Sequence, residues 1–210
     1  MNSKQLKYAE IFSFIAFVFF VVLIFYQQTN QRLQGELVEA KTKHKFPPNI
    51  TIQNTGKYAF KLGQANLTPQ LEQFIHDTVV PKIKERFKNY KVNIIEVIGH
   101  TDGVEFKGIS NLDKRLNVVA GNENRRIGSL KAGSNTDLGL MRALAIIKAL
   151  QKEEEMIQFF KEKGLGNKPM FRAYSAAQLY NTDGTIATSS AKENPSRRRI
   201  EIRFTYHEEN

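Results

Sequence analysis

The segment Ser134-Asn135-Thr136-Asp137-Leu138-Gly139-Leu140-Met141-Arg142-Ala143, which continues to Leu150, combines an apolar helical stripe with two conspicuous polar side chains. Its apolar residues recur at intervals of three and four, as they do on one face of an α-helix: Leu138, Met141, Leu144, Ala145, Ile147 (or Lys148) and Leu150. Asn135 and Arg142 are seven positions apart, so two helical turns bring them to the same side. We therefore expect a helix from Thr136 to about Phe160 that presents Asn135 and Arg142 to a ligand. A lone arginine on such a helix is more often solvated or ion-paired, so Arg142 needs support from other motifs.

The segments around this helix predict an α+β domain over residues 50–210. Leu67-Thr68-Pro69 is typical of a helix start, since threonine caps and proline suits the first turn, and Pro81 predicts a kink in that helix. Period-two or continuous apolar patterns predict four strands: Lys57–Leu62, Val92–Ile98, Met170–Tyr174 and Arg199–Tyr206. The order β-α-β-α-β-β favours a sandwich of helices on one face of a sheet.

The N-terminus carries an apolar run that predicts one transmembrane helix. Residues 11–26 contain sixteen consecutive positions without a formal charge, and extension to Tyr8 and Gln28 gives 21 residues, or about 31 Å of helix. The polar run Gln27–Arg32 follows where a signal peptide would need a small-residue cleavage site, so we expect an uncleaved anchor. We assign residues 1–10 to the cytoplasm, 11–28 to the membrane and 29–49 to a linker in which Pro47-Pro48 ends any helix.

The composition narrows the possible partners without choosing one. The formal net charge of +10 suits nucleic acid, an anionic membrane surface or an anionic cell-wall polymer. The chain has no cysteine, which excludes disulfides and thiolate metal clusters, and its four histidines lack metal-site spacing. We expect no cofactor, and His100 is interpreted as a buried, hydrogen-bonded turn residue. No nucleophile, base and orienting group occur in a recognisable spacing, so an enzyme is disfavoured.

A long segment, Gly103–Gly133, separates the strand near Ile98 from the Arg142 helix. It contains six basic and three acidic residues, a net charge of +3. One interpretation is a solvated surface loop with a small hairpin. The other is an additional contact surface, either for a cell-wall polymer or across a dimer.

Three separated motifs together resemble the OmpA-like peptidoglycan-binding family, which includes the flagellar stator B subunits. They are Gly99-His100-Thr101-Asp102, the Asn135-x-x-Leu138-x-x-x-Arg142-Ala143 helix and the strand Arg198-Arg199-Ile200-Glu201-Ile202. The resemblance covers about 150 residues. Two positions depart from the family pattern: Gly139 replaces a serine, which lowers helix propensity by about 1 kcal/mol relative to alanine, and Arg197 replaces an asparagine.

The family resemblance implies roles for individual residues. Family members bind the diaminopimelate or equivalent residue of the peptidoglycan stem peptide. By resemblance, Asp102 binds the ligand's ammonium group, and the guanidinium group of Arg142 forms two parallel hydrogen bonds with the ligand's carboxylate. Asn135 fixes the turn or donates to the ligand, Arg198 supports the ligand, and Leu138 belongs to the binding segment as a packing residue.

The membrane segment carries a further resemblance. Tyr8-Ala9-Glu10 followed by a phenylalanine-rich run is similar to the stator B-subunit helix, in which an aspartate carries the coupling ion. A carboxylate in a low-dielectric environment has a raised pKa, so Glu10 would bind and release a proton in this role. The alternative is a carboxylate in the headgroup region, favourably placed near the helix N-terminus.

Taken together, the motifs favour a stator-like B subunit. Within that group the pattern, including Phe171–Leu179, is most similar to the B subunits of the Zorya anti-phage defence system. This resemblance implies a single-pass inner-membrane protein with a cytoplasmic N-terminus and a periplasmic domain. Its partners would be peptidoglycan, a second copy of the chain and multi-span channel subunits of the A type (MotA/TolQ-like), with protons as the coupling ion and no nucleic acid. A flagellar stator B subunit and a passive tether between inner membrane and cell wall are the alternatives.

Overall fold

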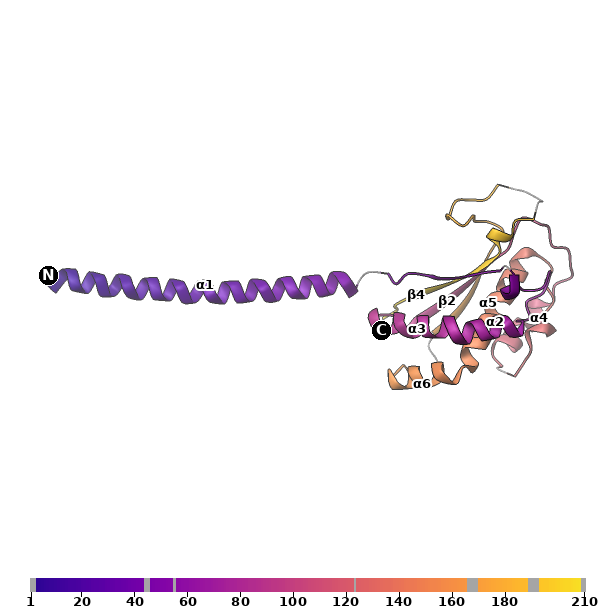
Figure 1. The fold of residues 1–210 in the computed structure, drawn as a ribbon, viewed down its shortest axis with the longest axis horizontal. Coiled ribbons are helices and arrows are strands. Elements are labelled where there is room, and N and C mark those ends of the chain that lie inside the picture. Colours follow the sequence, from indigo (N-terminus) through magenta and orange to yellow (C-terminus); the bar gives the residue numbers. More distant parts are fainter. Residues whose placement is uncertain are drawn as a thin grey trace. The chain divides into compact units, whose positions relative to one another are not determined.

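The chain forms two compact units, Met1–Lys45 and Phe46–Asn210. The computed structural model describes residues 3–43, 46–54, 56–122, 124–165, 170–188 and 193–208. The first unit consists of one helix, and the second contains a four-stranded sheet with helices (Figure 1).

The first unit is the 41-residue helix α1 (Ser3–Lys43), which is about 60 Å long. Its stretch Phe12–Leu37 has a mean hydropathy of 1.9 and is long and apolar enough to cross a membrane, a property that signal sequences near an N-terminus share. Large apolar side chains along it, such as Phe14 and Phe17, are exposed within the unit. The helix continues through most of the segment assigned to the linker and ends four residues before Pro47.

The sheet of the second unit has the order β1-β4-β2-β3. Its strands are β1 (Ile50–Gln53), β2 (Ile94–His100), β3 (Met170–Ala177) and β4 (Arg199–Thr205). β4 is antiparallel to both β1 and β2, whereas β3 runs parallel to β2. The inward half of the alternation predicted for the last strand is confirmed, because Ile200, Ile202 and Phe204 are all buried in the core, but Glu201, which the alternation places on the outward face, is buried as well.

The first helical segment of this unit consists of α2 (Pro69–Phe74), a π-helical turn (Ile75–Val79) and α3 (Val80–Asn89), which follow one another without a break. The predicted cap is present: Thr68 Oγ1 accepts a hydrogen bond from Leu71 N at 3.2 Å. Proline lacks an amide hydrogen and crowds the carbonyl group four residues before it. The carbonyl group four residues before Pro81 belongs to Asp77, which lies in the π-helical turn. The wider turn therefore relieves the crowding at this position.

The helix predicted from Thr136 to Phe160 is instead two helices, α5 (Asn135–Lys152) and α6 (Glu154–Glu162). Glu153, with an extended backbone (ψ 112°), separates them. The turn brings Phe159 and Phe160 against Phe87 of α3, with ring centroids 6.4 and 4.9 Å away. This packing joins aromatic residues that are far apart in the sequence, and it stabilises the break between α5 and α6.

Two further expectations are wrong. The segment Lys57–Leu62 is not a strand: it begins in a 3₁₀ turn (Gly56–Tyr58) and then runs irregularly, because Asn54 Oδ1 accepts the amide hydrogen of buried Phe60 in place of a strand partner. The first strand is β1 instead. The segment Gly103–Gly133 is not simply a solvated loop with a hairpin, since it contains α4 (Leu112–Ala120) and a 3₁₀ turn (Ile127–Ser129).

The Gly103–Gly133 segment also contributes to the core. Five of its side chains are buried in the main apolar cluster: Leu112, Val119, Ile127, Leu130 and Ala132. On α5, Lys148 is buried and its Nζ donates to the carbonyl oxygen of Asn122 at 2.7 Å. The sheet and this segment therefore both cover α5. This explains why most side chains of α5 are buried, and not only those of a single apolar stripe.

Candidate functional site

A cavity of about 470 Å³ brings together the residues that the sequence motifs single out. Asp102, Asn135, Leu138, Arg142 and Arg198 all line it. They come from three places in the chain: the turn after β2, the first two turns of α5 and the start of β4. The remaining wall is formed by Asn54, Ala59, Phe60, Leu62, Gly63, Thr101, residues 104–107 and Glu193.

Arg142 is a buried cation in this wall. It is 3% exposed, its Nε donates to the carbonyl oxygen of Gln64 at 3.0 Å, and its guanidinium carbon lies 5.2 Å from the centre of the Phe60 ring. Burial, with a contribution from nearby Arg198, lowers the pKa of Arg142 to about 10, and Asp102 acts in the opposite direction. The group therefore remains charged at neutral pH. Its two terminal nitrogens make no hydrogen bond or ion pair with the described residues, so they are free to bind a ligand's carboxylate.

Asp102 is the carboxylate of the cavity, and it is 6% exposed. Its contacts are long: Oδ1 accepts from Val104 N at 3.3 Å, and Oδ2 accepts from Asn194 N at 3.4 Å. Oδ2 also lies 3.4 Å from Arg198 Nη1, which forms a shorter ion pair of 2.7 Å with Glu193. No ion pair among the described residues joins Asp102 to Arg142. The two opposite charges thus line one cavity without neutralising each other by direct contact.

Asn135 and Leu138 shape the cavity from the N-terminal end of α5. Ser134 caps this helix, because its Oγ accepts from Asp137 N at 3.2 Å. Asn135 Nδ2 donates to the carbonyl oxygen of Val104 at 2.8 Å, which ties the helix to the turn that carries Asp102. This hydrogen bond is the contact that the turn-fixing role requires, and Asn135 also lines the cavity. Leu138 is 4% exposed and forms apolar wall.

The sequence motifs miss the aromatic and apolar part of the cavity. Phe60 is buried beside Arg142, and Phe106 lies at the wall as well. Leu62 and Val104 also line the cavity and are exposed. The apolar content of Tyr58–Leu62 is visible in the sequence, but no local signal shows that it lies against α5.

A second polar cluster lies on the sheet but does not line the cavity. Glu201 is buried, and its carboxylate contacts Arg199 (2.8 Å), Arg203 (2.7 Å) and His100 Nε2 (3.3 Å). The contact with His100, followed by the hydrogen bonds from Arg203 and Arg199, holds the pKa of Glu201 well below its usual range although burial opposes this. His100 is buried, as expected, but it ends β2 rather than lying in the turn, and neither of its ring nitrogens forms the expected hydrogen bond with a described residue.

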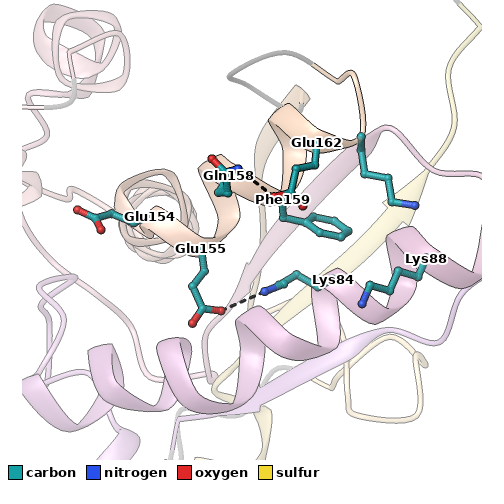
Figure 2. Close-up of a pocket in the computed structure, with 8 residues that line it drawn as sticks. Lys84, Lys88, Glu154, Glu155, Gln158, Phe159 and Glu162 are labelled. Atoms are coloured by element: carbon teal, nitrogen blue, oxygen red, sulfur yellow. Dashed lines mark hydrogen bonds and ion pairs between the residues drawn. The ribbon is translucent and has the colours of Figure 1, made fainter.

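A larger hollow of about 640 Å³ lies between α3 and α6, away from all predicted site residues. Figure 2 shows its lining, in which lysines face glutamates: Lys84 Nζ lies 3.1 Å from Glu155 Oε2, and Gln158 donates to Glu162 at 2.9 Å. Within the described part of the chain, no group of three or more His, Cys, Asp or Glu side chains is placed to hold a metal ion. Glu10 lies in α1, and its side chain is outside the described part.

Comparisons with known proteins give a weak structural likeness. No family model matches the chain, and no curated protein matches it. A crystal structure of a protein described as MotB-like, from Desulfovibrio vulgaris, is similar with 17% sequence identity and a TM-score of 0.41, over 86% of this chain and 94% of that one. Conclusions about function therefore rest on the residues of the cavity and on the sequence motifs.

Proposed function

We propose that the folded unit binds the stem peptide of peptidoglycan in the cavity between Asp102 and Arg142. The observation that carries this proposal is the arrangement of one buried carboxylate and one buried guanidinium in a single cavity without an ion pair between them. Such a site suits a ligand end that carries both an ammonium and a carboxylate group, because each desolvated charge then meets an opposite one.

The chemistry of the cavity suits the diaminopimelate residue of the stem peptide. The ligand's ammonium group donates to the Asp102 carboxylate, whose present contacts of 3.3–3.4 Å are long enough to yield to a stronger donor. The ligand's carboxylate accepts from the terminal nitrogens of Arg142, which is held in place by Gln64 and Phe60. Arg198 adds a second cation near Asp102.

We further propose that α1 anchors the chain in the inner membrane, with the N-terminus cytoplasmic and the folded unit periplasmic. In this role the chain is the B subunit of a proton-driven, stator-like complex of the anti-phage type. Two copies would supply their membrane helices to a ring of A-type channel subunits (MotA/TolQ-like), and Glu10 would carry the proton. The apolar stretch Phe12–Leu37 and the Tyr8-Ala9-Glu10 motif support this part of the proposal.

Binding of a diaminopimelate-containing muropeptide to the full chain in detergent tests the role of the cavity. We expect Asp102→Ala and Arg142→Ala each to weaken binding by at least about tenfold, since a charge-assisted hydrogen bond contributes roughly 1.5–3 kcal/mol. Asp113→Ala and Arg125→Ala remove the same side-chain types from exposed positions outside the cavity and serve as matched controls. Unchanged affinity in both cavity variants would refute the proposal.

A further inference from the structure

The Gly103–Gly133 segment presents a second surface that the cavity does not use. Five of its cationic side chains are exposed, and none forms an ion pair with a described residue: Lys114, Arg115, Arg125, Arg126 and Lys131. We call these five residues the basic surface. In the described part of residues 108–131, Asp113 is the single acidic side chain, so the basic surface carries a clear excess of positive charge.

The backbone beneath the basic surface is fixed by hydrogen bonds around Asn111. Its backbone carbonyl oxygen accepts from the amides of Lys114 and Arg115, and its side chain binds Ser129 O (3.1 Å) and Lys131 N (2.8 Å). These bonds hold the start of α4 beside residues 129–131. The buried side chains of Leu112, Val119, Ile127 and Leu130 attach the same segment to the core. The five cations are therefore carried by a segment that is packed on the core.

The charge pattern differs from that of the other charged groove. Between α3 and α6, three lysines and three glutamates line the groove, and Lys84 and Glu155 form an ion pair at 3.1 Å (Figure 2). The charges of this groove balance, whereas the five cations of the basic surface form no ion pair with any residue that the structure describes. Clustered cations raise the local concentration of an anionic partner and speed its association. Three of the five are arginines, whose planar fork matches phosphate oxygens.

We propose that the basic surface binds a phosphodiester-bearing anionic polymer of the cell envelope. The surface belongs to the same segment as residues 104–107, which line the cavity. It also follows the carboxyl end of β2, and Figure 1 shows α4 at the end of the folded unit opposite the one where β4 finishes. The choice of a wall-side polymer over a membrane rests on the proposed function, because a cavity that binds the wall turns this end of the unit toward it.

Binding of purified lipid-free poly(glycerol phosphate) to the full chain in detergent tests the proposal. Replacement of all five residues of the basic surface by glutamine should weaken binding at least about tenfold and flatten its dependence on salt concentration. A matched variant removes the same charge from five exposed lysines elsewhere and should stay within about threefold of the unmodified chain: Lys82, Lys88, Lys152, Lys161 and Lys163. An equal loss in both variants, or no loss in the first, overturns the proposal.

Three further measurements separate the possible outcomes. Arg142→Ala should lose muropeptide binding and keep polymer binding, and the five-residue variant should show the reverse, so the two sites fail independently. The double variant Arg125→Gln/Arg126→Gln lies outside α4 and keeps the test valid if the larger variant does not fold; unchanged polymer binding in it counts against the proposal. Loss of binding to phosphatidylglycerol vesicles with unchanged polymer binding overturns it in favour of a membrane contact.

Discussion

Gly139 of α5 lies directly against Gly99 of β2, closer than any side chain would permit. A Cβ atom on Gly99 would lie 2.0 Å from the carbonyl oxygen of Gly139, and one on Gly139 would lie 2.9 Å from the carbonyl oxygen of Gly99 and 2.3 Å from Ser175 Oγ. This approach sets the distance between the helix that carries Asn135 and Arg142 and the strand that leads to Asp102. The glycine that departs from the family pattern thus has a packing role in this chain.

Gly99→Ala should therefore be strongly destabilising. The new methyl group meets a helix backbone that can move only as a unit, so we expect a loss of roughly 3 kcal/mol in the free energy of unfolding. Gly139→Ala should cost less, because the Ser175 hydroxyl can rotate and alanine favours the helix by about 1 kcal/mol. Urea unfolding of the full chain in detergent measures both. Gly121→Ala is the control, with a negative φ of −78° and its nearest contact 3.2 Å away, and should change stability by less than about 0.5 kcal/mol. Equal stability of Gly99→Ala and the unmodified chain would contradict the prediction.

Asn135→Ala should loosen the turn that carries Asp102. The substitution removes the donor of the 2.8 Å hydrogen bond to Val104 O and leaves that carbonyl oxygen without its partner. We expect a loss of about 1–2 kcal/mol in stability and weaker muropeptide binding at temperatures where the variant is folded. Thr136→Ala, at an exposed neighbouring position, is the control. Muropeptide affinity equal to that of the unmodified chain would restrict Asn135 to a role in stability.

The cluster around Glu201 predicts a dependence of stability on acid pH. His100, Arg203 and Arg199 lower the pKa of Glu201 from its ordinary value of 4.5. A lowered folded-state pKa stabilises the fold above the ordinary value, and this contribution is lost as the pH falls toward the folded-state pKa. The free energy of unfolding should therefore fall between about pH 5 and pH 3, and less steeply in Glu201→Gln than in the unmodified chain. Parallel pH profiles for the two chains would show that other groups dominate.

The elements that the sequence predicts well are those with strong local patterns. The alternation in β4 places Ile200, Ile202 and Phe204 in the core, and Thr68 caps α2 as its type and position indicate. The motif residues Asp102 and Arg142 also meet in one cavity, because the turn after β2 and the start of α5 lie together. Local pattern was therefore sufficient for β2 and β4, and the motifs were sufficient to single out Asp102 and Arg142, whereas the strand predicted at Lys57–Leu62 beside the cavity was wrong.

The elements that the sequence misses depend on contacts between distant segments. Phe60 lies in an irregular segment because Asn54 Oδ1 accepts its amide hydrogen and Arg142 of α5 packs against its ring. Neither contact can be predicted from a short apolar run. The carbonyl group that orients Arg142 belongs to Gln64, 78 positions earlier in the chain. α4 has only nine residues and includes Val118-Val119, so its propensity is weak and packing of Leu112 and Val119 stabilises it.

Ala177 predicts a stabilising substitution next to the site. It follows the parallel part of β3 with a positive φ of 48°, its N–H donates to Ser175 Oγ, and its carbonyl oxygen accepts from Thr101 N at 2.8 Å. This left-handed conformation costs an L-residue about 1–2 kcal/mol, and glycine adopts it freely. Ala177→Gly should leave stability unchanged or raise it by up to about 1 kcal/mol, whereas Ala177→Val should lower it. Ala173→Gly, within the same strand, should instead destabilise by about 0.5–1 kcal/mol. The reverse order of the two glycine variants in thermal unfolding would contradict this prediction.

Glu10 distinguishes a motor from a passive tether. In the proposed anti-phage complex, Glu10 carries the coupling proton. Glu10→Gln removes the only titratable group of the Tyr8-Ala9-Glu10 motif that can exchange this proton near neutral pH, so the proposal predicts that protection of cells against phage is lost. Glu10→Asp keeps a carboxylate and should retain at least part of the activity. Membrane insertion and muropeptide binding should be the same in all three chains, because the cavity lies in a separate unit. A tether needs the cavity and the anchor but no proton, so full protection by Glu10→Gln together with loss of protection by Arg142→Ala would establish the tether instead.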